Sequence, residues 1–99
     1  MNFDWDEEKN ASNIRKHGLD FADAWEVFDS YILRKRAQGD FGEERFLGFG
    51  ALDEHIVAVV FTMRGDTIRV ISLRKAKRDE RREYKQAIAD RLGEARRDG

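Results

Sequence analysis

What the sequence lacks already excludes several kinds of chemistry. There is no cysteine, so disulfides, thiolate metal sites and thiol catalysis are all excluded. Two histidines cannot by themselves fill a structural zinc site, and we expect neither a metal nor a cofactor. The longest apolar run, residues 56–63, is far shorter than the ~20 residues that a membrane helix needs.

Proline is also absent, and no low-complexity stretch or internal repeat divides the chain. A sequence of 99 residues therefore predicts one domain, residues 1–99, built around a single core. Near the amino terminus, Asp4, Asp6, Glu7 and Glu8 stand where a signal peptide would carry positive charge. We therefore expect a cytoplasmic protein without a membrane segment.

Charge is abundant but unevenly distributed along the chain. Charged residues make up 39% of the sequence, above the ~25% typical of soluble domains, although the net charge is only −1. Residues 1–30 carry eight acids and three bases, whereas residues 64–99 carry seven acids and twelve bases. Because a clustered basic face attracts polyanions whatever the net charge, the last third of the chain predicts a nucleic-acid contact.

The first third of the chain predicts two helices that follow a short edge strand at residues 2–5. Asp6 suits the N-cap of a helix over residues 7–17, and Gly18 suits the left-handed position just after it. Asp20 suits the N-cap of a second helix, which has the i, i+3, i+4, i+7 spacing of one buried face. The residues of that face are Phe21, Ala24, Trp25 and Phe28, and Trp5 is also expected in the core.

The rest of the chain predicts a run of strands followed by a charged helix. The expected strands are residues 31–36, 44–52, 56–64 and 67–74, with tight turns at 53–54 and 65–66. The final helix, residues 78–96, has a narrow apolar stripe of Tyr84, Ile88 and Leu92 with Ala87 and Ala95. The predicted class is α+β: an antiparallel sheet with two N-terminal helices and a C-terminal helix, in the order β-α-α-β-β-β-β-α.

The last predicted strand and the turn after it carry the strongest concentration of positive charge. Strand alternation places Ser72 and Arg74 on one face, and the other face receives Arg69, Ile71 and Leu73. Arg74 thus ends a packed strand, a rigid place from which a guanidinium can hold a phosphate by two hydrogen bonds. The alternative is that these arginines are solvated or pair with Glu80 and Glu83.

Three further side chains are candidates for proton transfer or charge stabilisation. His17, beside Lys16 at a helix end, can exchange protons near neutral pH, or it can simply complement the helix dipole. Arg45 follows two glutamates, so a surface ion pair is the simple alternative to a catalytic role. Glu80 can act as a base, yet an acid is also favoured electrostatically in the first turn of a helix. His55 lies in a predicted turn and is given no role.

Three segments of the sequence resemble those of the BrnT family, and together they cover residues 3–84. The first is Phe3-x-Trp5-Asp6-x-x-Lys9-x-x-x-Asn13-x-x-Lys16-His17-Gly18-Leu19-x-Phe21-x-x-Ala24. The second is Glu44-Arg45-Phe46-x-x-x-Gly50. The third is Arg69-Val70-Ile71-Ser72-x-Arg74-x-Ala76-x-x-x-Glu80-Arg81-x-x-Tyr84.

This resemblance implies a toxin of a bacterial type II toxin–antitoxin module, with a fold similar to the RelE ribonucleases. Such a toxin would cleave RNA without a metal, block translation and be neutralised by a BrnA-type antitoxin. That antitoxin usually carries a ribbon-helix-helix segment, through which the complex contacts operator DNA.

Under this hypothesis Arg74 stabilises the reacting phosphate and His17 is the preferred acid or base, with Arg45 and Glu80 as further catalytic candidates. The residues expected to hold the RNA backbone are Lys16, Arg69, Lys75, Lys77, Arg78 and Arg81. A rival hypothesis is a non-catalytic module that acts only within an antitoxin and operator complex.

Overall fold

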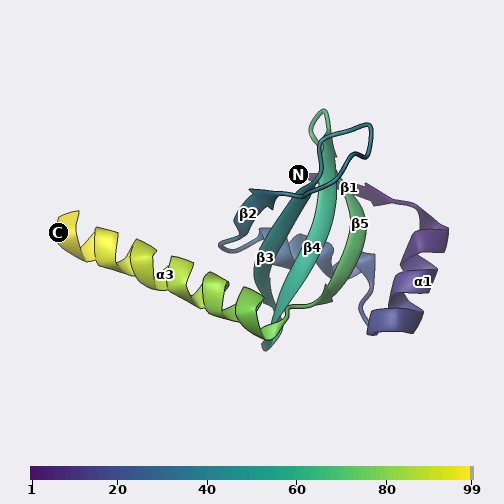
Figure 1. Cartoon of the computed structure of the whole chain (residues 1–99). Helices are drawn as coiled ribbons and strands as arrows, with labels where there is room; N and C mark the ends of the chain where they lie inside the picture. Colours follow the sequence, from purple (N-terminus) through teal and green to yellow (C-terminus); the bar gives the residue numbers. More distant parts are fainter. Residues whose placement is uncertain (99) are drawn as a thin grey trace.

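The computed structural model describes residues 1–98 and has helices on both faces of one sheet (Figure 1). Its strands are β1 (Asn2–Trp5), β2 (Leu33–Arg36), β3 (Phe46–Leu52), β4 (His55–Arg64) and β5 (Thr67–Lys75). Its helices are α1 (Glu7–His17), the 3₁₀ turn η1 (Phe21–Asp23), α2 (Ala24–Phe28) and α3 (Arg78–Asp98). The predicted α+β class and element order are confirmed.

The sheet has the strand order β1-β5-β4-β3-β2. Strands β2 to β5 form an antiparallel meander, which confirms the predicted run of hairpins. Strand β1 lies at the edge, as expected, but it pairs parallel with β5, from Asn2 opposite Thr67 to Trp5 opposite Val70. The first and the last strands of the chain are therefore neighbours.

Alternate residues of the central strand β4 contribute to two separate cores. Val57, Val59 and Phe61 are buried with Phe21 and the helices of the first third of the chain. On the opposite face, Ala58 packs with Phe49 of β3 and Tyr84 of α3. A central strand covered on both faces is what its unbroken apolar sequence predicts.

Helix α1 begins and ends where the sequence predicts. The Asp6 carboxylate accepts hydrogen bonds from the backbone N–H groups of Glu8 (2.8 Å) and Lys9 (3.1 Å). Those two hydrogen bonds lower the pKa of Asp6 below its ordinary value. Gly18 has φ of 70° and its N–H donates to the carbonyl of Ile14, so the left-handed cap is also present.

The second predicted helix is split, and this corrects the prediction that Trp25 is buried. The 3₁₀ turn η1 is followed by the short α-helix α2, and the buried apolar residues of this segment are Phe21, Ala24 and Val27. Trp25 lies outside this buried set and is 52% exposed, while Phe28 stays partly buried against the core.

A bulge in β5 corrects the predicted division of its residues between the two faces. Val60 of β4 lies opposite Ser72 but Phe61 lies opposite Val70, so one extra residue of β5 falls between them. Leu73 consequently joins Val70 in the first core, whereas alternation had placed it with Arg69. Arg69 and Arg74 therefore lie on the same face of the sheet.

Helix α3 packs on the sheet only through its first turns and then projects away from it (Figure 1). Tyr84 is buried and donates a hydrogen bond to the carbonyl of Tyr31 (3.0 Å), and Ile88 packs beside it. Leu92, one turn further along, is 56% exposed because the helix has by then passed the edge of the sheet. The side chain of Ala95 lies outside the described residues.

Candidate active site and nucleic-acid interface

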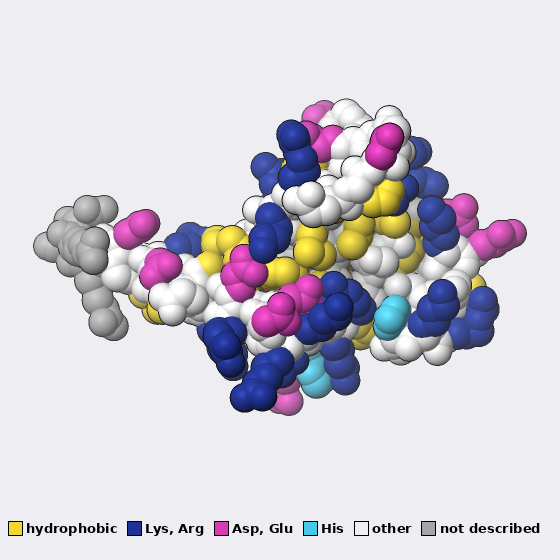
Figure 2. Space-filling model, viewed as in Figure 1, with side chains coloured by type: hydrophobic (Ala, Val, Ile, Leu, Met, Phe, Trp, Pro, Cys, Tyr) yellow, Lys and Arg dark blue, Asp and Glu magenta, His cyan; other side chains and the backbone are white. Residues whose placement is uncertain are grey.

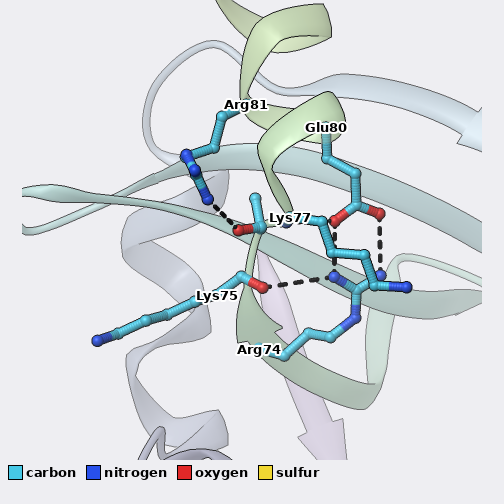
Figure 3. A network of polar contacts seen from close by, with 6 residues as sticks. Arg74, Lys75, Lys77, Glu80 and Arg81 are labelled. Carbon is cyan, nitrogen blue, oxygen red and sulfur yellow. Dashed lines mark hydrogen bonds and ion pairs between the residues drawn. The ribbon is translucent and has the colours of Figure 1, made fainter.

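The candidate site lies where β5 ends and the chain turns into α3 (Figure 3). Five residues with charged side chains occur in this short segment: Arg74, Lys75, Lys77, Glu80 and Arg81. Arg74 and Glu80 point toward one another, whereas the Lys75 side chain points away from this pair (Figure 3). Four of the five carry positive charge, so this end of the sheet is a basic surface.

Arg74 and Glu80 form a two-pronged ion pair at the centre of this surface. Arg74 Nη1 donates to Glu80 Oε1 (2.7 Å), and Nη2 donates to Oε2 (3.0 Å). The side chains are 25% and 11% exposed, so the pair is partly screened from water. The alternative in which Arg74 pairs with Glu80 is therefore the arrangement present.

The Glu80 carboxylate also fixes the start of α3. Its Oε1 accepts the backbone N–H of Lys77 (2.8 Å), which satisfies one of the unpaired donors at a helix N-terminus. The hydrogen bonds from Arg74, more than those from the backbone, lower the pKa of Glu80 below its ordinary value. A carboxylate with a lowered pKa is a weak base, so the geometry suits Glu80 to holding Arg74 rather than to moving a proton.

Two buried asparagines, which sequence reasoning did not single out as functional, attach α1 to the rest of the molecule. Asn13 Nδ2 donates to the carbonyl of Leu73 (2.7 Å), and the Leu73 N–H donates to Asn13 Oδ1 (3.1 Å). Strand β1 pairs with β5 only as far as Val70, so it does not reach Leu73. The Asn13 amide instead supplies the hydrogen bonds that a neighbouring strand would make to Leu73.

Asn10 makes the equivalent attachment to η1. It donates to the Asp20 carboxylate (2.9 Å) and accepts the Phe21 N–H (2.9 Å). The sequence feature that could have indicated these two attachments is the spacing of Asn10 and Asn13. They are three residues apart on one face of a helix that has few apolar residues.

The Asn13 attachment brings two predicted site residues to the end of β5. Lys16 and His17 follow Asn13 by three and four positions, so they share its side of the helix. Both side chains are exposed in the last turn of α1. His17 and Lys16 thus lie one helical turn beyond Asn13, whose amide contacts Leu73, the residue before Arg74.

Two other predicted residues lie at the far end of the sheet. Arg45 precedes β3, and its guanidinium stacks on the ring of Phe41 at 4.3 Å. Measured along the direction of the strands, Arg45 lies about four residue positions, or roughly 13 Å, from Arg74. Arg69 pairs with Asp4 at 3.4 Å and is likewise remote from Arg74.

Among the side chains of residues 1–94, His, Asp and Glu nowhere gather in a group of three or more that suits a metal ion. Within residues 1–98, no helix combines the length and the apolar character that crossing a bilayer requires.

Fold and site together define a small α+β domain with one basic end that suits a polyanion. A family model described as "Ribonuclease toxin, BrnT, of type II toxin-antitoxin system" matches residues 5–80, most of the chain. The chain therefore belongs to the BrnT family of ribonuclease toxins, and membership in a type II system implies an antitoxin partner. Among curated proteins, no match was found.

Proposed function

We propose that this protein is a metal-independent endoribonuclease that cleaves RNA, inhibits translation in the cytoplasm and is neutralised by its antitoxin. The observation that carries the proposal is the position of Arg74, which ends a packed strand and is oriented by Glu80. The preceding residue, Leu73, is bound by Asn13 of α1, the helix that carries Lys16 and His17. A guanidinium held in a fixed orientation can donate hydrogen bonds to a phosphate, which supports phosphodiester chemistry.

In the proposed reaction the RNA supplies its own nucleophile. A base removes the proton of a 2′-hydroxyl, whose oxygen then attacks the adjacent phosphorus. The bond to the 5′-oxygen breaks, and an acid gives that oxygen a proton. The products are a 2′,3′-cyclic phosphate and a 5′-hydroxyl, and we assign His17 to one of the two proton transfers.

Arg74 would stabilise the negative charge that develops on the phosphate oxygens. Glu80 accepts one N–H of Nη1 and one of Nη2, and the carbonyl of Lys75 accepts the other N–H of Nη1 (3.4 Å). The Nε–H and the second N–H of Nη2 are left for a substrate. We therefore propose Glu80 as a positioning residue for Arg74. The stacking of Arg45 on Phe41 favours a structural role for that arginine.

The basic residues around Arg74 would hold the RNA backbone. Lys75, Lys77, Arg78 and Arg81 belong to the same turn and helix start, and Lys16 would contact the backbone from α1. Arg69 is less suited, because Asp4 offsets its charge and it lies away from the turn.

The antitoxin would be BrnA-type, with a ribbon-helix-helix segment that links the complex to operator DNA. We expect it to cover at least part of residues 69–81, since covering the Arg74 surface is the direct way to stop cleavage. If the purified complex cleaves RNA as fast as the free toxin, this shielding is wrong.

A second candidate function is a non-catalytic partner module. Its support is the ion pair itself, because Glu80 offsets the charge of the arginine that would have to act on phosphate. The two functions predict different outcomes when the protein is expressed alone, since only a ribonuclease arrests growth.

The decisive experiment is expression with and without the antitoxin, followed by mapping of RNA ends. The ribonuclease proposal predicts growth arrest without the antitoxin, and new RNA ends that carry 5′-hydroxyl and cyclic phosphate groups. Folded protein that neither arrests growth nor produces such ends would establish the partner module instead.

A further inference from the structure

The outer face of α3 forms a basic groove next to the candidate site. Four basic side chains, Arg78, Arg81, Arg82 and Lys85, line it together with Gln86, and it encloses about 470 Å³. Their spacing of i, i+3, i+4 and i+7 places all four on one side of the helix. Figure 2 shows Lys and Arg side chains gathered where α3 leaves the sheet.

This groove continues onto the end of the sheet. A second groove, of about 300 Å³, shares Arg81 and Lys85 with the first and adds Lys75 and His55 at the ends of β5 and β4. One acid, Glu54, also lines the second groove. The two grooves form a continuous basic path that starts at Lys75, the residue after Arg74 in the chain, and follows α3 outward.

The positive charge of this path is largely uncompensated within the molecule. Among the side chains of residues 1–94, the ion pairs involve Lys35, Arg36, Arg64, Arg69 and Arg74, and none involves a base that lines the path. Arg81 is also fixed in place, because its Nη1 donates to the carbonyl of Ala76 (2.8 Å).

We propose that this path binds the backbone of single-stranded RNA on one side of the cleavage site. The inference rests on the proposed function and extends it to residues beyond the family match, since Arg81, Arg82 and Lys85 follow residue 80. Arginine is suited to phosphate because its planar fork offers two parallel hydrogen bonds. A protein partner fits less well, because the groove on α3 is lined by no aromatic or apolar side chain of the kind that forms the core of a protein interface.

The test is the salt dependence of RNA binding by a double variant, Arg82→Gln/Lys85→Gln. Glutamine removes both charges and keeps a good helix former at exposed positions, so the fold should be retained. The matched control is Lys9→Gln/Arg64→Gln, which removes the same charge from exposed positions away from the path. The probe is a 2′-O-methylated single-stranded oligoribonucleotide, whose blocked hydroxyl group prevents cleavage during the measurement.

Fluorescence anisotropy at several salt concentrations should separate the two variants. Each lost phosphate contact to single-stranded RNA lowers the salt slope by about 0.7, so the path variant should lose about 1.4. Its affinity near 0.1 M salt should fall about 10-fold or more, while the control keeps wild-type affinity and slope. A path variant that binds like the control would overturn the proposal.

Two further measurements distinguish this proposal from the catalytic one. If the path variant loses affinity and slope as expected but wild-type protein never cleaves unmodified RNA, the path is correct and the ribonuclease function is wrong. If wild-type protein cleaves RNA and the path variant still binds like the control, only the path is wrong. Loss of antitoxin binding with unchanged RNA affinity would make this face a protein contact, and would also overturn the proposal.

Discussion

Helices α1 and α3 are attached to the same end of β5, at consecutive residues, by different chemistry. The neutral amide of Asn13 holds α1 to the backbone of Leu73, whereas the charged carboxylate of Glu80 holds α3 to the side chain of Arg74. The first contact is buried and the second is partly open to water. The Asn13 amide holds α1 in position and has no further role. The ion pair with Glu80 holds α3 and also orients the Arg74 guanidinium, which can bind a substrate.

The largest effect should follow from removing the group that meets the substrate. Arg74→Ala should lower the cleavage rate by about 10²–10³, because one preorganised donor to the transition state is lost. Arg74→Lys should also be impaired, since an ammonium cannot make the two-pronged contact. Growth arrest and cleavage rate are the measurements, with circular dichroism as the control for folding. A folded Arg74→Ala protein that arrests growth at the wild-type dose would remove Arg74 from the mechanism.

The amide attachment should matter most for stability. Asn13→Ala leaves the N–H and carbonyl of Leu73 without their partner, which should lower the free energy of unfolding by about 2–4 kcal/mol. The control is Ile14→Ala on the same helix, whose side chain is 42% exposed and should cost about 1 kcal/mol or less. Urea unfolding measures both. Equal losses in the two variants would mean that Asn13 contributes little.

Glu80→Gln should distinguish a positioning residue from a base. Glutamine keeps an oxygen that accepts one Arg74 hydrogen bond but loses the charge, so we expect about a tenfold loss in cleavage rate. Loss of a general base would cost about 10²–10⁴ and would remove the limb of the pH–rate profile that the base controls. An unchanged profile with a modest loss supports positioning. Loss of the acidic limb would return Glu80 to the catalytic residues.

Acid should loosen the α3 attachment and spare the α1 attachment. The pKa of Glu80 is lowered in the folded state, so its stabilisation is complete above the unfolded value of about 4.3 and is lost as pH falls through the folded value. Hydrogen-exchange protection of the Lys77 amide should therefore decrease below about pH 4, before that of Leu73. Glu80→Gln should abolish this difference. Parallel loss at both amides would instead indicate global unfolding, to which Asp6 and Asp20 contribute.

The smallest effect is expected at the edge of the site. Lys77→Ala should remove one backbone contact among several, lowering the salt slope of RNA binding by about 0.7 with little change in cleavage at low salt. The same anisotropy series measures it. A loss in cleavage as large as that of Arg74→Ala would give Lys77 a direct part in the reaction.

Local sequence signals predicted most of the elements because their causes are local. The cap residues Asp6 and Gly18 set the ends of α1, and the apolar run of β4 marked a strand covered on both faces. The bulge in β5 and the exposure of Trp25 were not predictable in this way. Both depend on how β5 fits against β4 and how η1 fits against the core, which are contacts between distant parts of the chain.

In the candidate site, too, local sequence features indicated individual residues but not the contacts between distant parts of the chain. Arg74 and Glu80 were both recognisable as residues of interest, and their pairing was left open as one alternative. Only the fold joins them, and only the fold places Arg45 near the other end of the sheet. The role of Asn13 depends on a contact 60 residues away in sequence, for which a helix pattern carries no information.

The pairing of β1 with β5 has a consequence for how the protein is made. Synthesis proceeds from the amino terminus, yet Asn2 and Asn13 meet their partners only after residues 67–73 exist. Contacts between distant parts of a chain form late and slowly. The site that we propose is thus assembled only after residues 67–80 have left the ribosome. Until then, the nascent toxin would be unable to cut the messenger that encodes it.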